Sequence, residues 1–143
     1  MKVLSRKIWL ITVCLTLCIV VAHGQVSSST AKIEALLQQN MPDNKVNVRK
    51  AGSVIVIETN NMGNEQDFQI PYAGVTYHCT YSNTKNNTDT LYQVSISCAD
   101  NKDCIILYKN NKEERKKTIW YTFRGGADAY AFVDLMNGLK REK

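Results

Sequence analysis

The stretch YQVSISCADNKDCIILY, residues 92–108, holds the densest pattern in the chain. Two apolar runs flank a five-residue polar turn, and Cys98 and Cys104 stand where that turn begins and ends. Strand-prone runs on either side of a short polar turn are typical of a β-hairpin. We therefore predict a hairpin pinned by a disulfide between Cys98 and Cys104, whose role is architectural and not catalytic.

The register of this hairpin follows by counting if Cys98 lies opposite Cys104. The predicted pairs are Ile96 with Ile106, Val94 with Tyr108, Ser97 with Ile105, and Ser95 with Leu107. One face is then apolar throughout, whereas Ile105 and Leu107 on the other need cover from a neighbouring element, as in a curled sheet. Closing so short a loop contributes about 2 kcal/mol of stability by chain-entropy arguments.

The first 24 residues have the parts of a secretory signal peptide. Basic residues at positions 2, 6 and 7 precede an apolar segment over 8–22, and Ala22-His23-Gly24 places small residues where a signal peptidase cuts. We expect an exported chain, periplasmic or secreted, that begins at Gln25. An uncleaved anchor is the alternative, but the strongly apolar core over 10–21 is shorter than the roughly 20 residues that a spanning helix needs.

Removal of this signal changes the charge of the chain. Of 18 basic residues three lie in the signal, and all 13 acidic residues lie outside it. The remainder thus has 15 basic and 13 acidic residues, a net charge of +2 in place of +5. Nucleic-acid binding needs a concentrated basic face, so we expect no nucleic-acid partner. The remaining length suits a flexible leader over 25–30 and one domain over 31–143.

Three cysteines remain after the signal: Cys79, Cys98 and Cys104. An oxidising compartment favours a disulfide, and three cysteines allow one intramolecular bridge. Spacing favours Cys98 with Cys104 and leaves Cys79 as a free thiol, whereas pairing of Cys79 with either partner is the alternative.

Periodicity predicts an α+β fold in one domain. A helix with Ile33, Leu36 and Leu37 on one face begins after a cap at Ser29 or Thr30 and ends near residue 40. About seven antiparallel strands follow in a meander that forms a curled sheet or partial barrel. The predicted strands span residues 45–51, 54–57, 67–70, 75–82, 90–98, 104–109 and 117–123, with a turn over 110–116. An amphipathic helix over 127–140 caps the sheet, with Ala129, Phe132, Val133 and Met136 on its apolar face.

Residue types that carry catalysis are sparse. His78 is the one histidine beyond the signal, and no serine motif supports a catalytic triad around it. Glu58 is the one acid placed to share a pocket with another acid, and no such partner is evident from the sequence. Because His78 and Cys79 point to opposite faces of a strand, they cannot join Cys98 and Cys104 in a zinc site. We predict no catalytic residue, no metal site and no cofactor.

The run KNNKEERKK, residues 109–117, is the strongest concentration of charge. Its basic residues are Lys109, Lys112, Arg115, Lys116 and Lys117. Such a run is usually a solvated hairpin tip, but it could also contact an anionic surface with an affinity that falls as salt rises. Asn86-Asn87-Thr88 matches the N-glycosylation sequon.

Seven short antiparallel strands followed by one amphipathic helix resemble the pleckstrin-homology-like superfold. The ending FRGGADAYAFVDLMNGL, residues 123–139, is similar to the final strand and capping helix of that architecture. CADNKDCI at 98–105, the charged turn and IWYTF at 119–123 resemble small exported bacterial proteins of unassigned function. The resemblance covers residues 45–140. It does not imply phosphoinositide binding through Arg49 and Lys50, because that lipid belongs to cytoplasmic leaflets.

These features favour a non-enzymatic exported module that binds an unknown protein or envelope component through an apolar groove or a sheet edge. A small hydrolase or hydrolase inhibitor centred on His78 or Glu58 is the alternative. A third hypothesis is binding of anionic envelope surfaces through residues 109–117. We expect no transmembrane segment in the exported chain. The sequence does not indicate which oligomeric state the protein adopts.

Overall fold

The computed structural model describes residues 28–83 and 89–141. The predicted signal peptide, its cleavage site at Gly24 and the sequon at Asn86 lie outside the described residues, as do residues 25–27 of the predicted leader. The last two leader residues, Ser29 and Thr30, instead begin the first helix.

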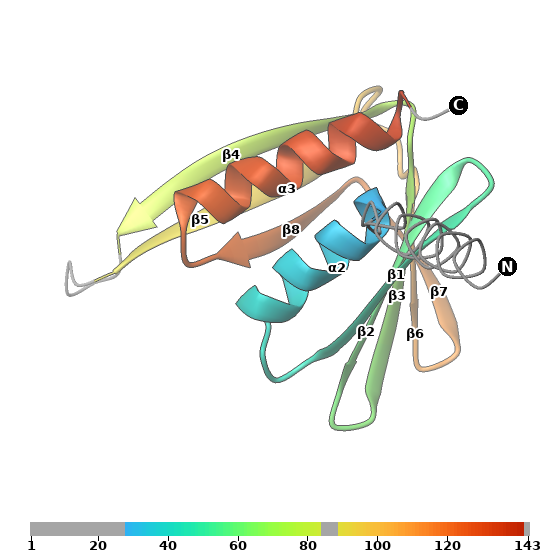
Figure 1. Cartoon of the computed structure of the whole chain (residues 1–143). Coiled ribbons are helices and arrows are strands. Elements are labelled where there is room, and N and C mark those ends of the chain that lie inside the picture. The colour runs from blue at the N-terminus through green and yellow to red at the C-terminus, as the bar shows by residue number, and fades with distance from the viewer. Residues whose placement is uncertain (1–27, 84–88, 142–143) are drawn as a thin grey trace, which may run out of the picture.

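Two helices and eight strands make up this part of the chain, which confirms the α+β class (Figure 1). They are α2 (Ser29–Asn40), β1 (Lys45–Ala51), β2 (Val54–Asn61), β3 (Asn64–Pro71), β4 (Val75–Asn83), β5 (Thr90–Cys98), β6 (Ile105–Lys109), β7 (Lys112–Lys116), β8 (Thr118–Phe123) and α3 (Gly126–Leu139). Sheet A has the strand order β1-β2-β3-β6-β7, and sheet B has the order β4-β5-β8. All pairs in both sheets are antiparallel.

The two sheets are successive parts of one bent meander. β3 leads into β4, β5 leads into β6, and β7 leads into β8. The neighbours in sheet A, β3-β6-β7, therefore continue as the neighbours β4-β5-β8 in sheet B. Three long segments cross from one sheet to the other, whereas β1 and β2 stay in sheet A, so the sheet is strongly curled and does not close.

The predicted hairpin between residues 92 and 108 is wrong, although its disulfide is present. β5 pairs with β4 and β8, and β6 pairs with β3 and β7. The four predicted pairs, Ile96 with Ile106, Val94 with Tyr108, Ser97 with Ile105 and Ser95 with Leu107, therefore do not form. The chain reverses instead at Asn110 and Asn111, whose φ angles of 52° and 59° suit the tight turns of two-residue hairpins.

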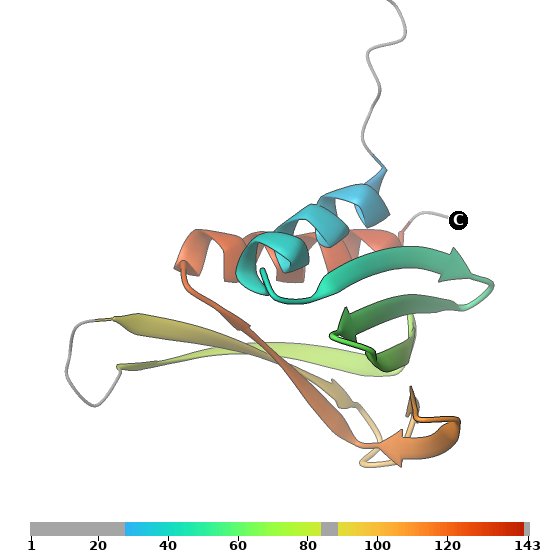
Figure 2. The ribbon, with the colours of Figure 1, turned by 90° about the horizontal axis from the view of Figure 1, so that it is seen from below.

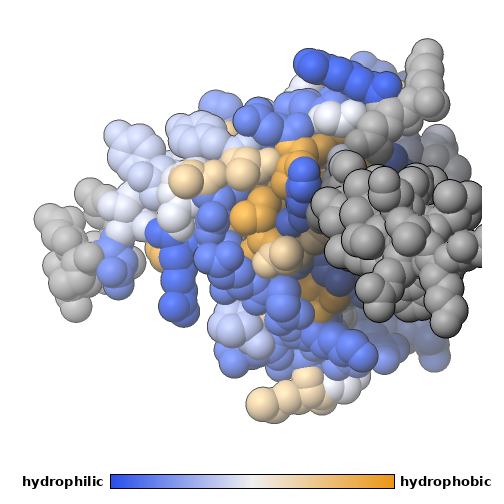
Figure 3. All heavy atoms as spheres, viewed as in Figure 1, coloured by the Kyte–Doolittle hydropathy of each residue, from blue (hydrophilic) through white to orange (hydrophobic). Residues whose placement is uncertain are grey.

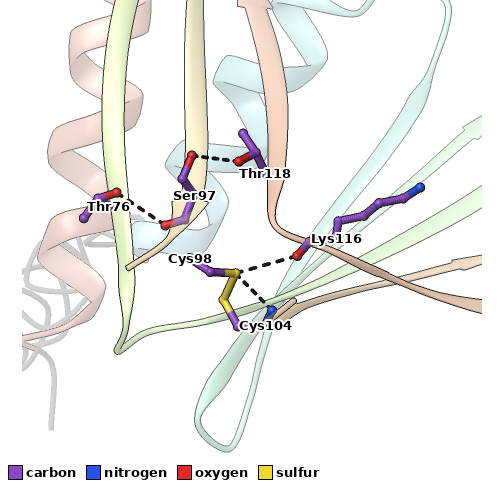
Figure 4. Close-up of a disulfide and its surroundings, with 6 residues drawn as sticks. All are labelled: Thr76, Ser97, Cys98, Cys104, Lys116 and Thr118. Atoms are coloured by element: carbon purple, nitrogen blue, oxygen red, sulfur yellow. Dashed lines mark hydrogen bonds between the residues drawn. A yellow bond between two sulfur atoms is a disulfide. The ribbon is translucent and has the colours of Figure 1, made fainter. Parts of the chain in front are cut away.

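The disulfide closes a loop that projects from one bent segment (Figure 4). On one side of the loop, the Cys98 N–H donates to the Lys117 carbonyl oxygen at 2.9 Å. On the other side, Ile105 pairs with Lys116. Lys116 and Lys117 are neighbours in the segment formed by β7 and β8, yet one pairs after the loop and the other before it. The bond between Cys98 and Cys104 brings the two ends of the loop together.

Close polar contacts around the sulfur atoms order this crossing. The Cys104 N–H donates to Cys98 Sγ at 3.0 Å, and the Lys116 carbonyl oxygen lies 3.6 Å from the same sulfur. Next to it, the hydroxyl oxygens of Ser97 and Thr118 are 3.0 Å apart and join β5 to β8 (Figure 4).

The predicted turn over residues 110–116 is also wrong beyond its first two residues, because Lys112–Lys116 is strand β7. The composition of this strand hid it from sequence-based prediction, because every side chain of KEERK is charged and no alternation of apolar and polar residues marks a strand. β7 is an edge strand that is exposed along most of its length, and charged side chains are common there.

The helices lie next to each other, with α3 packed on sheet B and α2 beside β1 (Figures 1 and 2). α2 begins slightly earlier than predicted, because Ser28 Oγ accepts the Ala31 N–H at 3.2 Å and caps the first turn. As predicted, Ile33 and Leu37 are buried, and so are the α3 residues Ala129, Phe132 and Met136. The buried side chains of both helices and both sheets form one core.

We predict that replacing both disulfide cysteines, in Cys98→Ser/Cys104→Ser, lowers the free energy of unfolding by about 2 kcal/mol, because the unfolded chain regains the entropy of the open loop. Chemical denaturation measures this change, and Cys79→Ser is the matched control with an unchanged midpoint under non-reducing conditions. If the double variant unfolds at the same denaturant concentration as the parent, the bond does not stabilise the crossing.

Candidate functional site

Four strands form the edges of the two sheets: β1 and β7 in sheet A, and β4 and β8 in sheet B. An edge strand exposes backbone N–H and C=O groups that can pair with another chain, so proteins usually cover or charge their edges. An edge that is neither covered by other residues nor charged is therefore a candidate binding site for a partner.

Side chains of α2 cover the β1 edge. The Val46 N–H donates to Gln38 Oε1 at 3.1 Å, and the Val48 N–H donates to Glu34 Oε2 at 2.9 Å. Gln38 also donates from Nε2 to the Asn44 carbonyl oxygen at 2.6 Å. The helix thus supplies the acceptors that a neighbouring strand would otherwise supply.

Charge protects the β7 edge, where the predicted basic run lies. Lys116 Nζ is 2.6 Å from Glu114 Oε2, and Arg115 Nε is 3.5 Å from Glu113 Oε1. Lys109 and Lys112 face each other across the tip of the β6–β7 hairpin, and Lys117 follows the strand. The basic residues are therefore interleaved with carboxylates and do not form one uniformly positive face.

The β8 edge is open beside Trp120 and Thr122. The hydrogen bond from Cys98 to Lys117 fixes which residues of β8 bond to β5, because bonded pairs alternate along an antiparallel ladder. Backbone groups of Ile119, Tyr121 and Phe123 point toward β5, and those of Trp120 and Thr122 point away. Within the described ranges, no strand or side chain pairs with these outward groups of Trp120 and Thr122.

Asn40 closes one end of this edge. Its Oδ1 accepts the Arg124 N–H at 3.0 Å, while its Nδ2 lies 2.9 Å from the Leu36 carbonyl oxygen and 3.1 Å from Asp128 Oδ2. One amide therefore joins the end of α2 to the junction between β8 and α3, and the open part of the edge stops at Arg124.

A hollow of about 380 Å³ runs beside the open edge. It is lined from sheet B by Leu91, Trp120, Tyr121 and Thr122, with Arg124 beyond β8, from sheet A by Thr59, Gln66 and Phe68, and from the end of α2 and the following turn by Asn40, Met41 and Asn44. An adjoining hollow of about 400 Å³ shares Asn44, Thr59 and Gln66, and it is also lined by Lys109. Together they form a groove between the inner end of sheet A and the edge of sheet B, which we call the β8 groove.

Aromatic rings give the β8 groove an apolar part. The rings of Phe68 and Tyr121 meet edge to face at 6.2 Å, and Tyr121 also contacts Phe132 at 5.5 Å. Trp120 is 59% exposed on the edge strand itself. Large exposed aromatic side chains are enriched at protein interfaces.

The Tyr121 hydroxyl is the unusual polar group of the groove. The residue is only 6% exposed, and its oxygen has no hydrogen-bond partner among the described residues. Burial raises the pKa of Tyr121 above its ordinary value. A buried hydroxyl without a partner costs about 1–3 kcal/mol of stability.

A second apolar surface lies between the two helices. Figure 3 shows hydrophobic atoms gathered between α2 and α3 and surrounded by hydrophilic side chains. Leu36 of α2 and Val133 and Leu135 of α3 are half-buried and pack against the core. This surface belongs to two helices and offers no sheet edge among the described residues.

The structure does not bring His78 and Glu58 together. His78 is exposed on β4 in sheet B, whereas Glu58 lies on β2 in sheet A. Glu58 accepts hydrogen bonds from Asn47 Nδ2 at 2.6 Å and from Arg49 Nε at 2.9 Å, and these bonds lower the pKa of its carboxyl group. A carboxylate held in its charged form is a poor general acid.

The acid beside Glu58 is Asp67, which the sequence interpretation missed. The two residues face each other across β2 and β3, and a hollow of about 600 Å³ lies next to them. Desolvation, followed by the charge of Glu58, raises the pKa of Asp67. Counting outward from the turn at Met62 and Gly63 would have found the pair, because residues equally far from a two-residue turn lie opposite each other.

Cys79 is the free cysteine of the described residues, as predicted, and it is half-buried on β4. Burial raises the pKa of its thiol, which disfavours the reactive thiolate. Residues 28–83 and 89–141 contain no group of three or more His, Cys, Asp or Glu side chains arranged to hold a metal ion. Neither described helix has the length and hydropathy needed to cross a membrane.

No family model, no curated protein and no solved structure matches this chain. The resemblance to the pleckstrin-homology-like superfold and to small exported bacterial proteins therefore stays a prediction.

We predict that Tyr121→Phe stabilises the protein by about 1 kcal/mol, because it removes a buried hydroxyl that has no partner and keeps the ring contacts. Thermal or chemical denaturation measures the change. Tyr108→Phe is the control, since the Tyr108 hydroxyl is exposed and donates to Glu113 Oε2 at 3.1 Å. A loss of stability in Tyr121→Phe would show that this hydroxyl is satisfied in solution.

Opposite pH effects are expected at Glu58 and Asp67. The pKa of Glu58 is lowered, so its stabilising effect is present above its ordinary value of 4.5 and is lost as the pH falls through the folded-state pKa. The pKa of Asp67 is raised, so its charged form destabilises the fold at neutral pH and protonation relieves this.

Glu58→Gln should therefore lower the melting temperature at pH 7, and Asp67→Asn should raise it. Both differences should shrink as the pH falls below about 4, where the carboxyl groups of the parent protonate. Because both side chains are largely solvated, each change should stay under about 1 kcal/mol. Melting curves between pH 3 and 7 test this, and shifts of the same sign would contradict it.

Proposed function

We propose that this protein is an exported, non-enzymatic interaction module that binds an extended polypeptide segment by strand addition to β8. The observation that carries this proposal is the open edge at Trp120 and Thr122 beside the β8 groove. Extended peptides pair with open sheet edges through main-chain hydrogen bonds, and pockets for alternate side chains supply specificity.

The other edges of the molecule favour β8 by comparison. The β1 edge is covered by Glu34 and Gln38, and the β7 edge is charged throughout. On β4, the Val75 carbonyl oxygen accepts Lys140 Nζ at 3.1 Å, and no residue of β4 lines the β8 groove. Among the described residues, β8 has outward backbone groups that no side chain covers and that stand beside a hollow wide enough for side chains.

Export is supported by two features of the chain. The first 24 residues have the pattern of a signal peptide, and Cys98 is bonded to Cys104. Disulfides persist in the periplasm and in secreted proteins and are rare in the cytosol. The partner is therefore an exported protein or an envelope component, as the signal-peptide pattern already predicts.

Neither alternative function gains comparable support. A hydrolase would need an enclosed carboxylate pair, and Glu58 and Asp67 lie on a solvated sheet face. Anionic-surface binding would need one basic face, and the run over 109–117 carries Glu113 and Glu114 between its cations.

We predict that Thr122→Pro abolishes binding of linear peptides while the protein stays folded. The Thr122 N–H points away from β5, so proline removes the donor offered to an added strand and leaves the ladder to β5 intact. The probe is a displayed library of random twelve-residue peptides selected on the disulfide-bonded protein, and peptide affinity is measured by fluorescence anisotropy.

Tyr81→Pro is the matched control, because Tyr81 occupies an outward position on the other edge of sheet B. Peptides selected on the parent should bind Tyr81→Pro as tightly as the parent. Equal binding to Thr122→Pro, or loss of binding in Tyr81→Pro alone, would reject β8 as the binding edge.

A further inference from the structure

The β8 groove carries positive charge and no negative charge. Lys109 lines one of its two hollows and Arg124 lines the other. The remaining polar side chains around them are neutral Asn, Gln and Thr, and among the described residues no Asp or Glu lines either hollow. A partner that enters this groove meets two cations, and a hollow with an acidic lining residue adjoins it, the one that Asp89 shares with Arg124.

Carboxylates gather on the other side of the same sheet. The hollow next to β1, β2 and β3 is lined by Glu34, Glu58, Glu65 and Asp67. The acidic side chains are thus partly segregated from the β8 groove, although Lys45 also lines this hollow and Arg49 is paired with Glu58. Segregation of this kind steers a charged partner to one face and away from the other.

We infer that the segment bound at β8 is acidic and belongs to another protein. This inference rests on the proposed strand addition and adds the chemistry of the partner. The segment carries Asp or Glu near Lys109 and Arg124, and between them an apolar side chain that packs on Phe68. Since side chains alternate along a strand, acidic and apolar residues at alternate positions fit such a groove.

The positions of this sequence outside the described residues, 1–27, 84–88 and 142–143, offer no such segment. Positions 1–27 and 84–88 contain no Asp or Glu, and positions 142–143 contain only Glu142. An acidic strand from this chain would have to leave a sheet or loop that the fold already uses.

A second copy of the protein is also a poor partner for this edge. Antiparallel pairing of β8 with itself around Tyr121 would bring Lys117 of one copy near Arg124 of the other. The same contact would occur twice by symmetry, so four cations would meet at one interface. Like charges placed opposite each other destabilise a strand pair.

Tyr121 adds a polar requirement to the site. The residue lines the groove, and its hydroxyl is buried and has no partner among the described residues. If the side chains that shield this hydroxyl move aside when the segment binds, a carboxylate or carbonyl oxygen of the segment would accept its hydrogen bond. Tyr121→Phe should then bind selected peptides several-fold more weakly although it is the more stable protein, a combination that a purely structural tyrosine does not produce.

The test compares peptides selected from the same random twelve-residue library on three proteins. On the parent, we expect enrichment of Asp and Glu over Lys and Arg relative to the starting library. On Lys109→Glu/Arg124→Glu, the enrichment should reverse, and peptides selected on the parent should bind about tenfold more weakly, as expected for two exposed charge pairs. Lys102→Glu/Arg141→Glu is the control with the same net charge, because these exposed cations line neither hollow.

Each outcome has a distinct meaning. Selected peptides that need the open edge, as shown by loss of binding to Thr122→Pro, but have no acidic bias would overturn this inference and leave the proposed function standing. Absence of any selected peptide would overturn both. A dimer in light scattering that Thr122→Pro dissociates would show that a second copy, and not an acidic partner, occupies β8.

Discussion

The fold depends on how one strand segment bends at the disulfide between Cys98 and Cys104. One long segment contains β5 and β6, and the segment beside it contains β7 and β8. Before the bend β5 pairs with β8, and after the bend β6 pairs with β7. The loop between the cysteines is extra length on one segment only. Without a bond across its base, the ends of that loop would be free to separate, and the ladder would lose its register at the crossing. The covalent bond therefore stabilises the point where sheet A ends and sheet B begins.

Local patterns in the sequence predicted most of the elements. Both helices lie where the periodicity of apolar residues indicates, and the alternation from Val75 to Tyr81 marks β4. The cysteine pairing followed from spacing alone. These features depend on residues close in the chain, which is why a single sequence reveals them.

The pairing of strands could not be predicted in the same way. Two turns were available after β5, one at 99–103 and one at Asn110 and Asn111, and the cysteines made the first more conspicuous. Each turn implies a different set of neighbours for β5, and only the second lets β8 return beside it. The choice depends on burial of Ile96, Ile105 and Ile119 in one core, which is a property of the whole fold. From the sequence we expected a groove or a sheet edge in general terms. The β8 groove is lined by residues of β2, β3, β5 and β8, so it could not be located before the arrangement of these strands was known.

The bend also explains why one edge stays open. Where the segments turn out of sheet A, β8 separates from the inner end of that sheet, and the β8 groove occupies the space between them. α2 has side chains that cover β1, but the helix ends at Asn40. The side-chain amide of Asn40 accepts the Arg124 N–H, and within the described ranges α2 covers no outward backbone group of β8 before Arg124. Among the described residues, the outward backbone groups of Trp120 and Thr122 are thus left without a neighbouring strand by the same geometry that orders the rest of the sheet. A protein without a partner would gain stability from a charged or covered edge at this position. Retention of an uncharged open edge, together with a buried hydroxyl on Tyr121, is the arrangement expected when a bound strand completes the sheet.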